Sequence, residues 1–432
     1  MFLKFNKNRH LLKINNKLAI QTASSTVISS CQICESNDLS SVLFLGYLPP
    51  VNQMWAVGNR PKEQPSYPAE LLYCNKCSLV QLGLCVDPEV LFPPSYPYTS
   101  GTTKILHDNF KELRDECVSL LGMGEKSLII DIGSNDGTLL SKFQTGNHQV
   151  HGVEPTDAAD IAIKAGIPTT KAFFSVKVAK KLRKNLGPAN IVTAANCFAH
   201  IEDVHEIVDA VFELLDEGGV FVSESHYLMD LLETVQYDTI YHEHLRYYSL
   251  TSLQQLFSSH GLDIIHASRI PTHGGSIRVY ATKKPAKFVE PSVNEVLNFE
   301  KSRGSMQEQL ENFKSRVIQS KVELHTIFQK IKKKNQRIYG ISAPSRASTL
   351  VNYAGIDDGI IDYVVEVSSS KKIGHYLPGT IIPVVNESFL FENQPEYALV
   401  LAWHIADELV PKLKELGYHG RFIIPLPRPH II

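Results

Sequence analysis

Short runs of apolar residues alternate with amphipathic segments from about residue 128 to about residue 282. This alternation predicts strands and helices in turn, as in a doubly wound sheet. The apolar run Leu128–Ile130 is of the kind found in a fully buried strand. Further strands of this first unit are expected at 148–153, 190–195, 220–224 and 273–280. A second α/β unit is expected from Arg337, with strands at 338–342, 361–367, 381–385, 398–403 and, at the sheet edge, 420–425.

Two further helical stretches are expected. The loop at 95–103 runs into a helix from about Lys104 to Leu121, ahead of the first strand. The span from Ser292 to Gln336 is charged, has apolar residues at helical spacing and is broken only by Gly304. It predicts one long linker helix between the two α/β units.

Length and composition limit the number and kind of domains. A chain of 432 residues is too long for one average domain, and 43% hydrophobic with 20% charged residues is typical of a soluble globular protein. The formal net charge of -2 gives no general attraction to nucleic acid or to an anionic membrane, so neither is expected as a partner. Residues 1–30 carry basic residues and no acid, and they predict a disordered extension, with an organelle-targeting leader as the minor alternative. Because no export signal or membrane-spanning run is found, we expect a cytoplasmic protein.

Two pairs of cysteines share the same C-x-x-C spacing. Each pair can place two thiolates on one side of a metal, and four thiolates make a closed tetrahedral zinc site. Such a site is usually structural, because it stabilises a small domain that lacks a large core. The alternative is four unrelated buried thiols, which the doubled spacing makes the weaker interpretation. The predicted Zn²⁺ ligands are Cys31, Cys34, Cys74 and Cys77.

A glycine turn follows the strand at Leu128–Ile130. Dinucleotide-binding loops have three glycines that admit a pyrophosphate, whereas this loop has two and keeps Asp131 at the strand end. A carboxylate there repels phosphate but suits S-adenosylmethionine (SAM), which is cationic. Glu154, at the end of the next strand, can accept both hydroxyls of a ribose. The alternative is an ordinary strand–turn–helix. The predicted SAM-binding residues are Asp131, Gly133, Asn135, Gly137, Glu154 and Asn196, the last at the end of the strand at 190–195.

The segment Tyr241–Tyr248 packs titratable and aromatic side chains into a few positions. His242 and His244 lack the i, i+4 spacing of a helical zinc pair, so acid–base chemistry is the better interpretation. One histidine can remove a proton near neutral pH, Glu243 can orient it, and a tyrosine can hydrogen-bond an oxyanion. The alternative is a surface helix with an incidental polar face. Upstream, the rigid loop 95–103 is expected to cover the SAM pocket, with Tyr98 reaching the reaction centre.

The second α/β unit has no acid after its first strand. Instead Ser345 and Arg346 stand at the start of a helix, where backbone amides favour an anion such as a diphosphate. A purely structural domain is the alternative reading of this unit.

Together these motifs resemble the SAM-dependent sugar C-methyltransferases that act on nucleotide-linked 4-keto deoxysugars. The resemblance runs from Cys31 to the C-terminus and includes the four cysteines, Asp131–Gly137, and the C-terminal segments 372–384 and 401–404. Residues 366–372 and 343–346 depart from the family pattern, which leaves the sugar and the nucleotide open. The fold implied is α/β: a small N-terminal zinc-binding domain, a central Rossmann-like SAM methyltransferase domain and a C-terminal Rossmann-like domain. The expected boundaries are 1–30, 31–95, 96–285, 286–336 for the linker helix, and 337–432.

The resemblance also implies roles for single residues. His244 lies in the family's Tyr-x-Glu-His element and is the expected general base. The implied catalytic residues are His244, Glu243, Tyr241, His200 and Tyr98. The implied substrate-binding residues are Ser345, Arg346, Lys372, Tyr376, Trp403 and His404. The implied activity is methylation of sugar C-3 through an enolate by a monomer or homodimer; an O- or N-methyltransferase and a non-catalytic zinc and SAM-fold binding protein are the alternatives.

Overall fold

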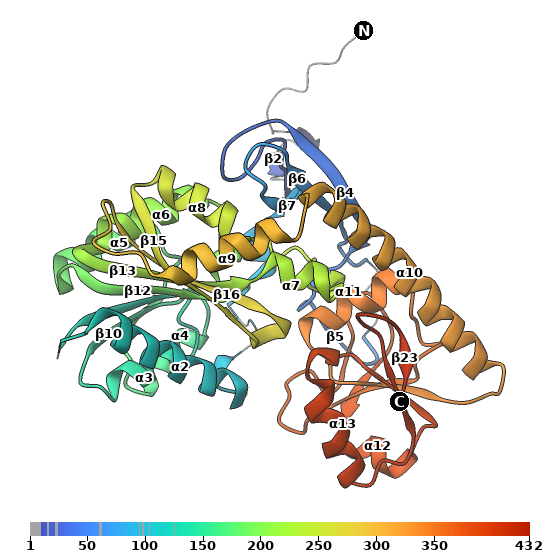
Figure 1. Cartoon of the computed structure of the whole chain (residues 1–432). Coiled ribbons are helices and arrows are strands. Elements are labelled where there is room, and N and C mark those ends of the chain that lie inside the picture. The colour runs from blue at the N-terminus through green and yellow to red at the C-terminus, as the bar shows by residue number, and fades with distance from the viewer. Residues whose placement is uncertain are drawn as a thin grey trace.

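The computed structural model describes residues 10–14, 17–21, 25–59, 63–94, 96, 99–102, 104–124 and 126–432. Three lobes are visible, an N-terminal domain at the top of Figure 1, a central domain at the left and a C-terminal domain at the lower right. None of the helices in the described part of the chain is both long and apolar enough to cross a bilayer.

The central domain is built on a seven-stranded sheet in the order β11-β10-β9-β12-β13-β16-β15. The first five strands run parallel, and β16 is antiparallel to both its neighbours. The strands are β9 Leu128–Ile132, β10 Gln149–Val153, β11 Thr169–Thr170, β12 Ala189–Ala195, β13 Leu215–His226, β15 Leu262–Ile270 and β16 Ser276–Lys283. The chain leaves β9 toward β10 on one side and later returns to β12 on the other. This reversal places the ligand crevice of such sheets at the carboxyl ends of β9 and β12.

Helices cover both faces of the central sheet (Figure 1). On one face lie α2 Lys104–Leu121, α3 Thr138–Gln144 and α4 Ala158–Lys164; on the other lie α5 Val176–Leu186, α6 Val204–Leu214, α8 Leu250–Ser259 and α9 Pro291–Ser302. The bounds of α2 confirm the helix predicted from Lys104 to Leu121. The short helix α7, Leu228–Glu233, lies toward the C-terminal domain.

The N-terminal domain has a four-stranded antiparallel sheet that takes its last strand from the central domain. Its order is β14-β7-β6-β4, with β4 Leu39–Leu48, β6 Tyr67–Cys74, β7 Val80–Leu82 and β14 Arg246–Tyr247. Arg246 pairs with Gln81 and Tyr247 with Val80. The segment predicted to hold the catalytic base is therefore hydrogen-bonded directly into the N-terminal domain.

Short strands complete the N-terminal region, including part of the extension for which we expect disorder. β1 His10–Ile14 pairs with β2 Lys17–Gln21, and β3 Ser25–Val27 pairs with β8 Leu84–Val86. A short helix, α1 Pro88–Leu91, follows β8. The other residues before Ser25 lie outside the described residues.

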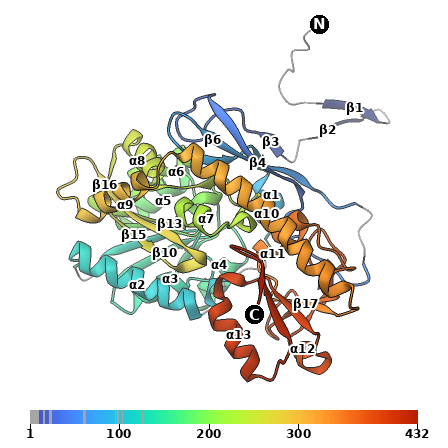
Figure 2. The same ribbon diagram turned by 45° about the vertical axis from the view of Figure 1, so that its right-hand side comes forward.

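Two helices replace the single linker helix expected over 286–336. α9 ends at Ser302, and α10 runs from Met306 to Lys332. The break falls at Gly304, whose φ of +85° lies in the left-handed region that ends a helix. α9 packs on the central domain, whereas α10, about 40 Å long, runs from the N-terminal domain along the C-terminal domain (Figure 2). The two helices thus connect all three lobes.

The C-terminal domain has a six-stranded sheet in the order β20-β18-β17-β21-β22-β23. Its strands are β17 Ile338–Ile341, β18 Tyr363–Glu366, β20 Val384–Asn386, β21 Tyr397–Val400, β22 Arg421–Ile424 and β23 His430–Ile431, and its helices are α11 Ser345–Ala354, α12 Ser388–Asn393 and α13 Ala406–Glu415. The expectation that 420–425 forms the sheet edge is wrong, because β23 pairs antiparallel to β22 on its outer side. The first five strands are parallel, so this domain is a second Rossmann-like unit.

Candidate active site

A cavity of about 920 Å³ lies where the three domains meet. Its wall includes Cys31 and Gln32 of the N-terminal domain, the glycine loop at Gly133, and the start of α11 from Pro344 to Arg346. The cavity therefore joins the ligand crevice of the central sheet to the C-terminal domain.

The glycine loop leaves no room for side chains at its two glycines. Gly133 has a φ of +66°, and a Cβ there would lie 2.8 Å from the Cβ of Cys197. Gly137 has a φ of +79°, and its Cβ would lie 3.0 Å from a side-chain carbon of Ile167. Both positions need glycine for backbone conformation and for space.

Two buried acids and an asparagine line or support this crevice. Glu154 accepts the backbone N–H of Asn135 at 3.0 Å, which closes the loop over the strand ends. Asp131 accepts the Thr193 hydroxyl at 2.6 Å. Burial, with a smaller contribution from Glu154, raises the pKa of Asp131 to about 7, although the Thr193 hydrogen bond opposes the shift.

Asn196 lines the cavity and carries an acceptor left unpaired within the described part of the chain. It has a φ of +61°, and its Nδ2 donates to the buried carboxylate of Glu224 at 3.2 Å. This contact turns Oδ1 the other way, and Oδ1 is buried without a hydrogen-bond partner among the described residues. An unpaired buried acceptor is costly, so this atom is suited to a ligand donor such as an ammonium group.

The loop upstream of α2 docks on the glycine loop. The backbone N–H of Ser100 donates to Asn135 Oδ1 at 2.9 Å, and that of Gly101 donates to Asp136 at 2.8 Å. This contact agrees with the expectation that the loop covers the crevice. Tyr98, the residue expected to reach the reaction centre, lies outside the described residues.

The Tyr241–His244 segment is buried rather than a surface helix. His244 is hydrogen-bonded through Nδ1 to the carbonyl oxygen of Thr239 at 2.7 Å. Since a carbonyl only accepts, Nδ1 carries the proton, and Nε2 is left with a free lone pair. His242 points elsewhere, with Nε2 at 3.2 Å from the carbonyl oxygen of Pro68. Of the two histidines, His244 alone lines the described cavity wall.

Other histidines surround His244. The rings of His200 and His226 each lie 4.9 Å from its ring, and that of Tyr241 lies 4.0 Å away. The His273 ring lies 5.7 Å from that of His226. Burial is the first cause that lowers the pKa of His200 and of His273 to about 4, and it holds the pKa of His244 well below its usual range. The cluster is therefore neutral at pH 7.

His226 and His273 also belong to this cluster, although neither was predicted from the sequence. His226 is the last residue of β13, at the carboxyl edge of the sheet. The strand-end rule that selected Asn196 could have selected it too. His273 lies in a turn before β16 and approaches the site only through the antiparallel pairing of β13 with β16, which no local pattern indicates.

Glu243 lies at the centre of a network that crosses domains. Its carboxylate accepts the hydroxyl of Tyr96 at 2.8 Å and Nδ2 of Asn52 at 2.8 Å. Burial raises the pKa of Glu243 to about 7, while these two donors and the nearby charge of Lys372 oppose the shift.

The four cysteines meet as predicted. Their Sγ atoms all lie within 4.8 Å of one another, with Cys31 to Cys77 at 3.4 Å and Cys34 to Cys74 at 3.5 Å. Thiolates bound tetrahedrally at about 2.3 Å from zinc stand roughly 3.8 Å apart. The donor set and its spacing fit a closed structural zinc site.

Comparison with known proteins shows to which family the chain belongs. Residues 31–92 match the family model "Putative zinc binding domain", residues 105–267 match "Methyltransferase domain", and residues 271–427 match "C-methyltransferase C-terminal domain". The chain is 32% identical to C-methyltransferase NovU of Streptomyces niveus over 94% of this chain and 97% of that protein. The chain belongs to the C-methyltransferase family. It is a SAM-dependent methyltransferase with a zinc-binding domain at its N-terminal end.

Two solved structures with similar chains are distant from this C-methyltransferase. The structure titled "Complex between the Haloferax volcanii Trm112 methyltransferase activator and the putative methyltransferase" gives a TM-score of 0.34 at 14% identity, covering 42% of this chain and 94% of that chain. The PH0226 protein of Pyrococcus horikoshii gives a TM-score of 0.35 at 12% identity, covering 45% of this chain and 98% of that chain.

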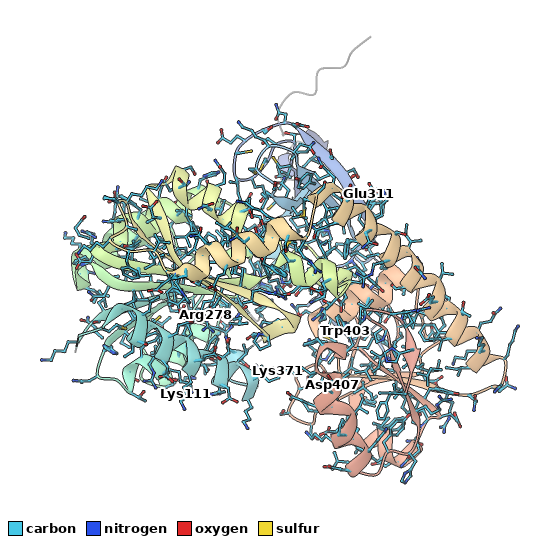
Figure 3. All side chains as sticks on the ribbon, viewed as in Figure 1. Lys111, Arg278, Glu311, Lys371, Trp403 and Asp407 are labelled. Atoms are coloured by element: carbon cyan, nitrogen blue, oxygen red, sulfur yellow. The ribbon has the colours of Figure 1, made fainter. Side chains whose placement is uncertain are left out.

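In this C-methyltransferase the predicted substrate residues divide into two groups. Ser345, Arg346 and His404 line the cavity, and burial is the main cause that lowers the pKa of His404 to about 2. Arg346 is also the main tie between domains, because it donates twice to Asp238 at 2.8 Å. Trp403 supports this ion pair, with its Nε1 donating to Asp238 at 2.7 Å and its ring 5.1 Å from the guanidinium; Figure 3 shows Trp403 at the inner side of the C-terminal domain.

The other predicted substrate residues are not brought to the described cavity wall. Trp403 stands behind Arg346. Lys372 is buried with Nζ donating to the carbonyl oxygen of Ala343 at 2.6 Å. The hydroxyl of Tyr376 accepts the backbone N–H of Gly58 at 3.2 Å, next to the pairing of β19 His375–Tyr376 with β5 Trp55–Ala56. These residues hold loops and domains together in the structure.

Proposed function

We propose that the protein methylates C-3 of a nucleotide-linked 4-keto deoxysugar through an enolate, with His244 as the general base. One observation carries the proposal: the Thr239 carbonyl holds His244 as the tautomer with a free Nε2, at a cavity shared by the glycine loop and the C-terminal domain. Carbon methylation needs such a base, because a C–H bond has to lose its proton before the carbon can attack.

The proposed base works on a carbon that the substrate itself activates. The ketone at C4 acidifies the hydrogen on C3. His244 Nε2 takes that proton, the C–H electron pair forms the C3–C4 double bond, and the C4 oxygen becomes an enolate. We assign the stabilisation of this oxygen to Tyr241 and His200, which both lie beside His244. The same electron pair would then form the bond from C3 to the methyl carbon, while the sulfur–methyl bond breaks with its electrons left on a neutral sulfur, and the C4 carbonyl would be restored.

The central domain supplies the second ligand. Bound SAM provides an electrophilic methyl group on a positively charged sulfur. We assign its ribose to Glu154, its ammonium to Asn196 Oδ1, and its overall positive charge to Asp131. Gly133 and Gly137 let the backbone approach it closely. Much of the acceleration then comes from holding two ligands in one cavity, and the four cysteines and their zinc stabilise the fold.

The direct test is mass spectrometry of the protein incubated with SAM and a panel of nucleotide-linked 4-keto sugars. We expect one sugar to gain a methyl group, which NMR places on carbon. In deuterated water without SAM, the same carbon should exchange its hydrogen. Transfer to oxygen or nitrogen without such exchange would replace the proposal by an O- or N-methyltransferase. SAM binding with no transfer to any sugar would exclude this acceptor class.

A further inference from the structure

Asn52 belongs to the N-terminal domain but contacts the other two domains through its amide. Its Nδ2 donates to Glu243 at 2.8 Å and to the hydroxyl of Tyr96 at 3.1 Å. Its Oδ1 accepts the hydroxyl of Ser345 at 3.0 Å. One half-buried side chain thus links the Tyr241–His244 segment to the first residue of α11.

The chain around Asn52 is fastened on both sides. Before it, β4 is paired along its length with β6, and Leu39 is opposite the zinc ligand Cys74. After it, β5 pairs with β19 of the C-terminal domain. The loop between these strands therefore has fixed ends, and Asn52 is held in the gap between the domains.

The orientation of the amide follows from its partners. An ionised carboxylate only accepts, so Nδ2 has to face Glu243, and Oδ1 then faces Ser345. A protonated Glu243 would favour the reverse arrangement, in which Oδ1 accepts from the acid and Nδ2 donates to Ser345. The amide can therefore adopt either of two arrangements. When the Ser345 hydroxyl donates to Oδ1 of Asn52, it favours the arrangement in which Nδ2 faces an ionised Glu243.

We propose that Asn52 is a positioning residue for the reaction: it holds the Glu243 carboxylate in its ionised form and ties that form to the start of α11 through Ser345. The consequence for turnover rests on the proposed function, whereas the tie itself does not. The other ionisable groups that face Glu243 are Tyr96, Tyr241 and Lys372.

A graded set of variants tests the tie in the full-length, zinc-loaded protein. Asn52→Ala removes a donor to the carboxylate, Asn52→Asp adds a like charge, and Ser345→Ala removes only the hydroxyl that orients the amide. Asn59→Ala, an exposed asparagine in the same loop region, is the matched control. The titration of Glu243 is followed by its infrared carboxyl band, assigned by its loss in Glu243→Gln.

Losing a hydrogen bond to a charged group favours the neutral acid. We expect the Glu243 midpoint to rise by about one pH unit in Asn52→Ala, by more in Asn52→Asp, and by less in Ser345→Ala. Asn59→Ala should match the unmodified protein. An unchanged midpoint in both Asn52 variants would overturn the proposal.

Kinetics separates positioning from simple folding support. In Asn52→Ala we expect turnover at pH 7 to fall about fivefold and to recover above pH 8.5, with SAM affinity unchanged within about twofold. An equal loss at every pH would overturn the positioning role. If the unmodified protein methylates no sugar, the proposed function fails, and the infrared midpoints still decide whether Asn52 controls Glu243.

Discussion

The central domain and the C-terminal domain each contain the same kind of turn after their first strand. After β9, the backbone N–H of Gly133 donates to the carbonyl of Val153 at 2.8 Å, and that of Asn135 donates to Glu154 at 3.0 Å. After β17, the N–H of Ser342 donates to the carbonyl of Val365 at 2.9 Å, and that of Ala343 donates to Glu366 at 2.7 Å. In both units an acid at the end of the second strand closes the loop that follows the first.

The side chains make these two turns different. The first unit has Asp131 in its first strand and two glycines, and Glu154 lines the cavity. The second unit has no acid there and a proline in its loop, and Lys372 caps the Ala343 carbonyl. Both turns line the cavity, the first with Gly133 and Glu154 and the second with Pro344, Ser345 and Arg346. Because the backbone turn is the same in both units, we expect the strand-end charge and the space left by glycine to decide which ligand each turn binds.

The largest expected effect is on chemistry at the Tyr241–His244 segment, as distinct from ligand binding at the two turns. If the two turns bind the ligands and His244 removes the proton, His244→Asn should lower turnover about a thousandfold and leave SAM affinity near normal. Asparagine can still donate to the Thr239 carbonyl, so the fold around it is kept. Single-turnover rates and calorimetric SAM titration measure the two quantities.

His242→Asn is the matched control for this variant. His242 is a neighbour of the same type whose Nε2 faces Pro68, outside the described cavity wall. Turnover by His242→Asn should stay within about threefold of that of the unmodified enzyme. A loss as large as that of His244→Asn would mean that the segment matters as a whole and that His244 is not specifically the base.

A smaller effect should distinguish the two equivalent acids. Glu154→Gln removes the charge that we assign to the ribose hydroxyls of SAM, and we expect the SAM dissociation constant to rise about 30-fold. Glu366→Gln should leave SAM affinity within about twofold and raise the KM of the proposed sugar-nucleotide substrate, because it loosens the loop that leads to Ser345. Equal weakening of SAM binding by both changes would contradict separate roles for the two turns.

Local signals predicted single elements well and junctions poorly. The helix expected from about Lys104 to Leu121 is α2, and the doubled C-x-x-C spacing predicted the cysteine cluster. Gly304, read as a tolerated residue within one helix, instead divides α9 from α10.

Contacts between distant parts of the chain had no local signal. The pairing of Arg246 with Gln81 and the hydrogen bond from Asn52 to Glu243 join different domains. The spacing of apolar residues along strands and helices therefore cannot indicate them. The same reason applies to Arg346, where the residue types at a helix start suggested an anion site. Its partner Asp238 stands 108 positions away, and it makes the arginine a link between domains.

The smallest expected effect is a difference in pH dependence between the two crevices. Asp131 has its pKa raised to about 7, mainly by burial, so near pH 6 it is largely protonated before SAM binds. A cationic ligand favours the ionised acid, so SAM affinity should fall roughly fivefold from pH 7 to pH 6, and protons should be released on binding.

Asp131→Asn should bind SAM more weakly at pH 7 and lose most of this dependence. The C-terminal turn has no such acid, so Ser342→Ala should leave the slope unchanged. A slope that persists in Asp131→Asn would assign it to another group and remove the strand-end charge as the feature that distinguishes the two turns.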